Sequence, residues 1–190
     1  MSSLNSPQGD EVVRDVSKIL VTGGAGFIGS NLVKKLVKLG FGVRVVDDMS
    51  KGSEKNLSDV LNRIELIVGD ITHRPVVREA VEGVHGIVHL AAKVDVRKSV
   101  KQPFLYNEVN STGTLNLLEA SKGQLKKFVY ASTCAVYGDP VRLPIDEGHP
   151  LCPLSPYAAS KLSGENYCTA YSNHQARARG TRAAASGPAL

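Results

Sequence analysis

The sequence predicts an α/β fold built on a doubly wound, parallel sheet of the Rossmann type. Short runs that are almost entirely apolar alternate with longer segments whose apolar residues recur at helical spacing. Strands that are apolar throughout are typical of parallel sheets covered by helices on both faces. A glycine-rich turn between the first strand and the first helix is the third indication, because such turns open dinucleotide-binding folds.

Five strands are expected, over residues 19–21, 42–47, 64–68, 86–90 and 127–131. Helices are expected over residues 26–39, 75–81, 103–120 and 157–171, and the proline-rich stretch 140–156 is expected to be a long loop. Right-handed crossovers between such units give a doubly wound sheet. We divide the chain into a flexible lead-in (residues 1–16), one dinucleotide-binding domain (17–174) and an irregular basic tail (175–190).

Composition excludes several classes of protein and of partner. The net charge is +5, but residues 1–174 carry 20 basic against 18 acidic residues, so a nucleic-acid partner is not expected. No apolar run is long enough to cross a membrane and no secretory signal is visible, which favours a cytoplasmic protein. Cys134, Cys152 and Cys168 are widely spaced, and the histidines lack partners at metal-binding spacing. We therefore expect reduced thiols and no metal site.

The glycine-rich turn runs from Thr22 to Gly29, with the sequence TGGAGFIG. Its glycines at 23, 26 and 29 let the backbone approach a pyrophosphate without Cβ atoms in the way. Free N–H groups at the start of the following helix then attract the anion. The ordinary alternative is a glycine-rich turn without a ligand, but here the motif has the required strand before it and helix after it.

An acidic pair ends the second predicted strand. Asp47 and Asp48 lie 18 and 19 residues beyond Gly29, where an acid accepts hydrogen bonds from the adenosine ribose and repels a 2′-phosphate. This position favours NAD over NADP, although Lys51 nearby weakens the argument. A dinucleotide site that prefers NAD is therefore expected.

Three side chains beyond the fifth strand form a candidate catalytic set. Tyr157 and Lys161 are four residues apart, so both project from one face of a helix. A nearby ammonium favours the phenolate and makes a tyrosine usable as a general acid and base. Thr133 follows the carboxyl end of a parallel strand, where such sheets bind ligands. Taken singly, each feature has an ordinary alternative. Tyr157 and Lys161 could share an exposed helix face without a catalytic role, and Thr133 could cap a turn.

These motifs together resemble the extended short-chain dehydrogenase/reductase family, and within it nucleotide-sugar epimerases of the UDP-glucose 4-epimerase type. The resemblance covers residues 18–171 and rests on TGGAGFIG, VVDDMSKGS, GDI, HLAAKVDVRKSV, NSTGTLNLLEA, STCAVYGDP and SPYAASKLSGE. It implies NAD as cofactor, a nucleotide sugar as substrate and a homodimer formed through the helices that contain Asn110 and Tyr157. The implied reaction removes a hydride from the sugar and returns it to the opposite face through a 4-keto intermediate.

The resemblance also implies a role for each matching residue. The pyrophosphate would be held by Gly23, Gly26, Phe27, Ile28 and Gly29, the ribose by Asp47, and the adenine by Asp70 and Ile71. Asp48 belongs to the same expected cofactor site. Leu90, Ala91 and Ala92 would line that site, and Asn110 would support the active-site end of a helix. Thr133 and Tyr157 would be catalytic, and Lys161 would bind the nicotinamide ribose and lower the pKa of Tyr157.

Two features set this chain apart from relatives with the same motifs. Dehydratases of the family carry Asp-Glu after the catalytic Ser or Thr, where this chain has Cys134-Ala135, and nucleotide-sugar decarboxylases usually have Glu in this stretch. The absence of these acids disfavours both the dehydratase and the decarboxylase activity. Family members also continue well beyond Lys161, whereas residues 175–190 are Ala- and Arg-rich, which suggests a truncated or frame-shifted product. The alternatives are then a non-catalytic NAD-binding module, an inactive remnant or another reductase or dehydratase of the family. An uncovered fifth strand at the sheet edge is also expected.

Overall fold

The computed structural model describes residues 17–178, and its centre is one parallel sheet in the order β3-β2-β1-β4-β5. The strands are β1 (Lys18–Thr22), β2 (Gly42–Asp47), β3 (Ile64–Val68), β4 (Gly86–His89) and β5 (Lys127–Tyr130). From β1 the chain builds the sheet first toward β3 and then, on the other side, toward β5. The reversal creates a switch point between β1 and β4, which is where such sheets bind ligands. The predicted fold class is confirmed.

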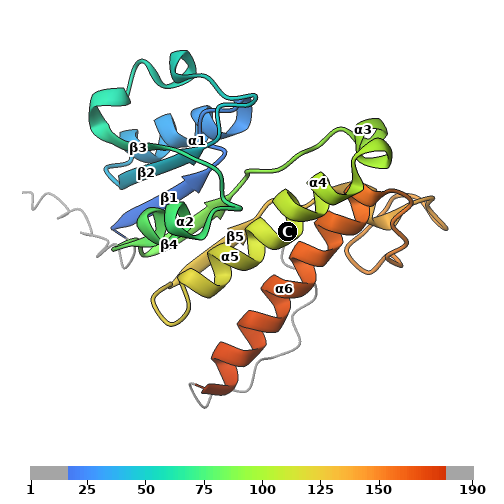
Figure 1. Cartoon of the computed structure of the whole chain (residues 1–190). Coiled ribbons are helices and arrows are strands. Elements are labelled where there is room, and N and C mark those ends of the chain that lie inside the picture. The colour runs from blue at the N-terminus through green and yellow to red at the C-terminus, as the bar shows by residue number, and fades with distance from the viewer. Residues whose placement is uncertain (1–16, 179–190) are drawn as a thin grey trace, which may run out of the picture.

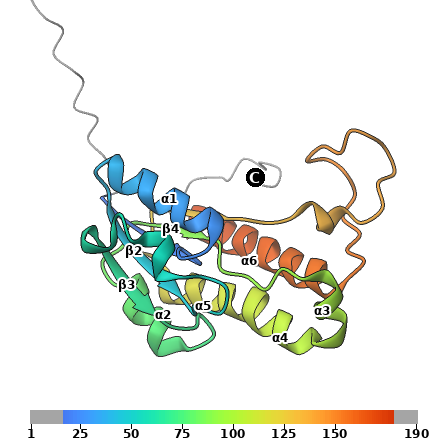
Figure 2. The same ribbon diagram turned by 90° about the horizontal axis from the view of Figure 1, so that it is seen from above.

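Helices cover both faces of the sheet (Figures 1 and 2). They are α1 (Phe27–Lys38), α2 (Arg74–Val81), α3 (Val96–Lys101), α4 (Pro103–Asn107), α5 (Gly113–Ala120) and α6 (Pro156–Ala178), with short turns η1 (Glu54–Leu57), η2 (Leu61–Arg63) and η4 (Cys134–Tyr137). Alternate residues of β1 serve the two cores: Ile19 and Val21 pack in the cluster that contains α1, and Leu20 packs in the cluster that contains α2 and α5. This alternation explains why the strand is apolar throughout.

Three segments differ from the sequence prediction. The helix expected over 103–120 is divided by a π-helical turn, η3 (Glu108–Thr112), and α3 was not predicted as a separate helix. The last helix continues to Ala178, seven residues past its predicted end at Tyr171. The first four residues of the predicted irregular tail are therefore helical, while residues 1–16 and 179–190 lie outside the described part.

Strand β5 lies at one end of the sheet, with β4 on its paired side. Its residues are only partly covered, and Val129 is 38% exposed. The expectation of an apolar strand at the sheet edge is therefore confirmed within the described residues.

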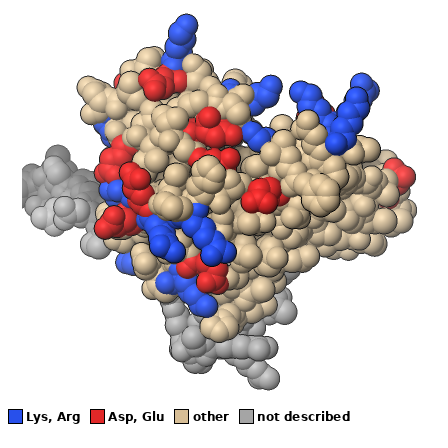
Figure 3. Space-filling model, viewed as in Figure 1, with Lys and Arg blue, Asp and Glu red and all other residues tan. Residues whose placement is uncertain are grey.

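Acidic and basic side chains are interspersed on the face shown in Figure 3. Arg44 of β2 makes several polar contacts, and it pairs with Glu65 of the neighbouring strand β3 at 2.6 Å. Its Nη1 also donates to the main-chain oxygens of Glu79, Ala80 and Glu82 at 2.7–3.0 Å. The guanidinium thus supplies a charged donor to carbonyls in the last turn of α2, where Glu79 O also accepts from Glu82 N at 3.4 Å. No helix in residues 17–178 has the length and apolar content needed to span a membrane.

Replacement of Arg44 by Met is expected to lower the free energy of unfolding by about 1–3 kcal/mol, because the α2 carbonyls lose a charged donor. Urea denaturation measures this loss. Lys34→Met is the matched control, since Lys34 makes one exposed ion pair with Asp59 and should cost less than about 1 kcal/mol. Equal losses for the two variants would contradict the capping role.

Candidate functional site

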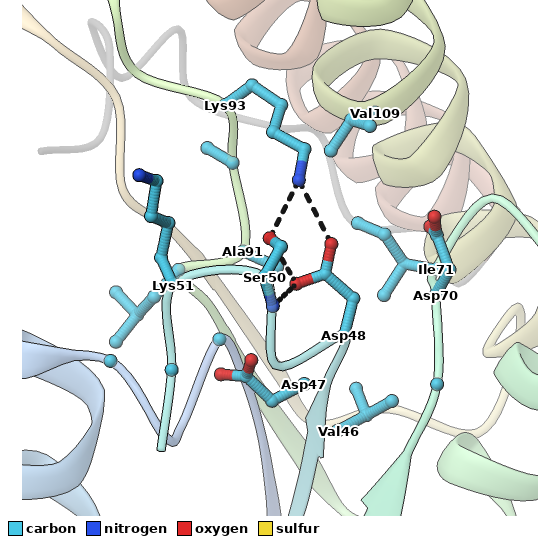
Figure 4. A pocket seen from close by; sticks show the side chains of 16 residues that line it. Val46, Asp47, Asp48, Ser50, Lys51, Asp70, Ile71, Ala91, Lys93 and Val109 are labelled. Carbon is cyan, nitrogen blue, oxygen red and sulfur yellow. Dashed lines mark hydrogen bonds and ion pairs between the residues drawn. The ribbon is translucent and has the colours of Figure 1, made fainter.

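A pocket opens at the switch point, at the carboxyl ends of β1, β2, β3 and β4 (Figure 4). Nine of the residues predicted to bind the cofactor line it: Gly23, Gly26, Asp47, Asp48, Asp70, Ile71, Leu90, Ala91 and Ala92. They come from separate stretches of sequence that the parallel sheet brings to one edge. The fold therefore gathers most of the predicted cofactor site.

Gly23 and Gly26 of the glycine turn line the pocket, and the backbone leaves no space for a side chain at Gly23 and Gly29. Gly23 has φ +68°, and a Cβ there would lie 2.8 Å from the Ala91 nitrogen. A Cβ on Gly29 would lie 2.2 Å from the Gly23 oxygen. Gly26, which begins α1, provides no side-chain cap for the helix. Main-chain N–H groups at the start of α1 are thus available to an anion, as pyrophosphate binding requires.

Phe27, Ile28 and Gly29 do not line the pocket itself. They form the first turn of α1 beside it, with the side chains of Phe27 and Ile28 exposed (84% and 69%). Their predicted contact with pyrophosphate concerns main-chain N–H groups, and it stays a prediction.

The two acids at the end of β2 have different surroundings. Asp47 is buried, and its two carboxylate oxygens accept hydrogen bonds from the N–H groups of Ala25 and Met49, both at 2.9 Å. It therefore holds the glycine turn in place as well as facing the pocket. Two lone-pair positions remain on this carboxylate for a ribose hydroxyl.

Asp48 takes part in a bridge across the pocket (Figure 4). The Lys93 ammonium, from the loop after β4, donates to Asp48 Oδ2 at 3.0 Å and to Ser50 Oγ at 2.8 Å. Partial burial would raise the pKa of Asp48, but hydrogen bonds from Ser50 and Lys93 outweigh that effect and lower the pKa below its ordinary value. Sequence reasoning missed Lys93, although its place directly after Ala92 at a strand end was a usable signal.

Further contacts fix the Ile71 side of the pocket and the strand ends. Thr22 Oγ1 accepts from the N–H groups of Leu90 and Ala91 at 3.2 and 3.1 Å, which joins the ends of β1 and β4. Asn116 Nδ2 donates to the main-chain oxygen of Ile71 at 3.1 Å. The predicted adenine contact Ile71 is therefore held by α5 as well as by its own loop.

The predicted catalytic residues lie next to this pocket and do not line it. Thr133 follows β5 and caps η4 by accepting from Ala135 N at 3.2 Å. Tyr157 and Lys161 lie on the first turns of α6, and both are buried. The Tyr157 ring packs edge-on against Tyr106, with ring centroids 6.4 Å apart.

Asn110 connects the pocket to helix α6. Its Oδ1 accepts from Lys93 N at 2.8 Å, and its Nδ2 donates to Lys93 O and to Ser160 Oγ, both at 3.0 Å. Ser160 Oγ donates in turn to the main-chain oxygen of Tyr157 at 2.7 Å. Asn110 lies in the π-helical turn, a geometry that recurs at functional sites. One buried amide thus sets the spacing between the pocket wall and Tyr157.

His89 is a core residue. It is 1% exposed, and its two ring nitrogens contact Thr22 Oγ1 at 2.6 Å and Thr114 Oγ1 at 2.9 Å. Burial lowers the pKa of His89 to about 3, with the Lys161 charge acting in the same direction. No cluster of three or more His, Cys, Asp or Glu side chains within residues 17–178 is placed to hold a metal ion.

The low pKa of His89 predicts acid sensitivity. An unfolded histidine takes up a proton near pH 6.5 and the folded one only near pH 3, so stability falls as the pH drops between these values, by up to about 1.4 kcal/mol per pH unit. Urea midpoints between pH 4 and 7.5 should fall less steeply for His89→Gln than for wild type. His73→Gln, at an exposed position, is the control. Parallel slopes for wild type and His89→Gln would contradict the assignment.

Comparison with known proteins places the chain in a family. The family model described as GDP-mannose 4,6-dehydratase matches residues 20–180. The chain belongs to this family. Among curated relatives, a putative UDP-glucose 4-epimerase of Methanocaldococcus jannaschii is 41% identical over 156 residues, which are 80% of this chain and 50% of that protein. The resemblance to epimerases and dehydratases stated above is confirmed.

Solved structures of family members superpose on the described fold. UDP-glucose 4-epimerase of Thermus thermophilus, in complex with NAD, gives a TM-score of 0.76 at 38% identity, covering 86% of this chain and 52% of that one. The Thermotoga maritima enzyme with UDP-glucose gives 0.77 at 37% identity, with the same shares covered. This chain spans about half the length of the relatives that it matches.

Proposed function

We propose that this chain binds NAD in the switch-point pocket and supplies the catalytic residues of an NAD-dependent nucleotide-sugar 4-epimerase. The observation that carries the proposal is the glycine cradle, in which Gly23 and Gly29 have no space for a Cβ, beside acids at the end of β2. Each part of an adenine dinucleotide has a matching group in this pocket. Main-chain N–H groups suit the pyrophosphate, Asp47 can accept a hydrogen bond from a ribose hydroxyl, and Ile71 offers an apolar wall to the adenine. The NAD complex of the Thermus thermophilus relative supports the choice of cofactor.

In this proposal the residues after β5 handle the proton. When bound, NAD supplies the acceptor and donor of the hydride at C4 of the sugar. Tyr157 takes the proton of the C4 hydroxyl as the hydride leaves, and returns it when the hydride comes back to the opposite face. Thr133 orients the same oxygen, and Lys161, on the same helix face as Tyr157, binds the nicotinamide ribose. The UDP-glucose complex of the Thermotoga maritima relative supports a nucleotide sugar as the substrate class.

A second candidate is a non-catalytic NAD-binding module. It is favoured by the lining of the pocket, which includes nine of the predicted cofactor residues but none of Thr133, Tyr157 and Lys161. A 4,6-dehydratase is disfavoured, because Thr133 is followed by Cys134 and Ala135, which carry no carboxyl group. A homodimer and a cytoplasmic location stay predictions.

Turnover of UDP-galactose to UDP-glucose by the purified chain separates the two candidates. Epimerase activity supports the enzyme, and Tyr157→Phe should then reduce it by about 10²–10⁴-fold while NAD stays bound, because only the phenolic proton is lost. A wild-type chain that binds NAD but neither binds UDP-glucose nor turns it over would support the module. Undiminished turnover by Tyr157→Phe would remove Tyr157 from its role.

A further inference from the structure

The ammonium of Lys161 lies over the ring of Tyr130, a residue for which the motif analysis gave no role. Lys161 Nζ is 4.1 Å from the ring centroid, within the range of a cation–π contact. The same ammonium donates to the main-chain oxygen of Ala131 at 2.6 Å. The Tyr130 hydroxyl donates to the main-chain oxygen of Lys161 at 3.1 Å. One tyrosine of β5 therefore contacts both the backbone and the charged end of this lysine.

The Tyr130 ring is fixed on two sides. On α6, a Cβ at Gly164 would lie 2.3 Å from the Tyr130 hydroxyl oxygen, so the glycine leaves the space that the phenol fills. On β4, the His89 ring packs against it with centroids 5.5 Å apart. The aromatic face under Lys161 thus has a set position.

The charge of Lys161 needs support because its side chain is buried, at 3% exposure. Burial lowers the pKa of Lys161 to about 8, while Glu165 and Cys168 act in the opposite direction. Cys168 is itself held neutral at pH 7, since burial raises its pKa to about 12, and the Glu165 carboxylate accepts a hydrogen bond from Ser132. His89 is neutral as well, and burial raises the pKa of Tyr130. Tyr157 is a further ionisable group on this face of α6, four residues before Lys161.

We propose that Tyr130 is a positioning residue for Lys161. The ring of Tyr130 stabilises the buried ammonium of Lys161 and holds it at the Ala131 carbonyl, and Lys161 lies on the same helix face as Tyr157. The electron-rich face of a phenol favours a cation in contact with it and has no such effect on a neutral amine. Tyr130 therefore acts on the reaction through Lys161. This inference rests on the proposed function, in which Lys161 serves NAD and Tyr157.

The test measures the titration of Lys161 in the full chain by carbon-13 NMR of ¹³Cε-labelled lysines, with the Lys161 signal assigned by its loss in Lys161→Met. Position 130 then carries Phe or a series of fluorinated phenylalanines, which keep the shape of the ring and progressively weaken its negative face. Tyr130→Phe should leave the Lys161 pKa near the wild-type value. A trifluorinated ring should lower the Lys161 pKa by about 0.5–1 unit, and rings with fewer fluorines should give intermediate values.

A Lys161 pKa that stays constant along the series would overturn the proposal, since a ring that only fills space is unaffected by fluorine. The series avoids large-to-small changes that could prevent folding. The titration requires no NAD, so it also separates this inference from the proposed function. Failure of the wild-type chain to bind NADH would count against the function, whereas a constant Lys161 pKa would count against Tyr130 alone.

Discussion

Gly29→Ala is expected to abolish NADH binding and to lower the free energy of unfolding by about 1–3 kcal/mol. The added Cβ would lie 2.2 Å from the Gly23 oxygen and 2.7 Å from the Gly24 Cα. Both are main-chain atoms of the turn, so the clash can be relieved only by opening the turn. An opened turn no longer presents its N–H groups to a pyrophosphate, and we expect the dissociation constant to rise at least ~100-fold, the loss of several charge-assisted hydrogen bonds.

Gly148→Ala is the matched control for this substitution. A Cβ at Gly148 would meet its nearest atoms at 3.5 and 3.9 Å, which is ordinary contact, in a loop away from the pocket. Fluorescence titration with NADH and urea denaturation of both variants measure the two effects. Wild-type affinity in a folded Gly29→Ala protein would mean that the dinucleotide binds elsewhere.

Lys161→Met is expected to weaken NADH binding at least ~10-fold and yet to leave the protein as stable as wild type or more stable. The folded environment lowers the pKa of Lys161 from 10.5 to about 8, which corresponds to about 3 kcal/mol against the charged form. Loss of the hydrogen bond to Ala131 offsets part of this cost, and a methionine fills similar space without a charge. A net gain of about 1–2 kcal/mol at pH 7 follows.

The stability gained by Lys161→Met should become smaller as the pH rises. The cost of the buried charge is fully present below about pH 8 and disappears as the pH rises toward 10.5, where the unfolded lysine also loses its proton. Urea midpoints of wild type and Lys161→Met should therefore converge between pH 8 and 10. A variant that is destabilised at pH 7 but binds NADH normally would mark Lys161 as a structural residue.

Strands and the glycine turn were predictable because local composition decides them. Strands β2 and β3 have the predicted bounds, since their apolar runs end at a glycine or an acid. The π-helical turn at Asn110 was not predictable, because one extra residue in a helical turn hardly alters a 3.6-residue period. The predicted end of α6 at Tyr171 is wrong, since the helix continues to Ala178 and so enters the Ala- and Arg-rich stretch assigned to the tail (175–190), where both residue types favour helix.

Most features of the site that the motifs did not predict are contacts between residues far apart in the sequence. Lys93 reaches Asp48 across 45 positions of sequence, and Tyr130 meets Lys161 across 31. Neither pair has a spacing that a motif could reveal. Strand order brings the ends of β2 and β4 to one edge of the sheet, and the packing of α6 against β5 brings Lys161 to Tyr130. The residues predicted to bind the dinucleotide, by contrast, lie at strand ends, a place that the sequence pattern does indicate.

Titration of the purified chain with NADH, followed by its fluorescence, tests the central claim most directly. We predict saturable binding of one NADH per chain, displaced by NAD and absent in Gly29→Ala. A wild-type chain that is folded by circular dichroism but shows no saturable binding at millimolar NADH would contradict the assignment of the switch-point pocket.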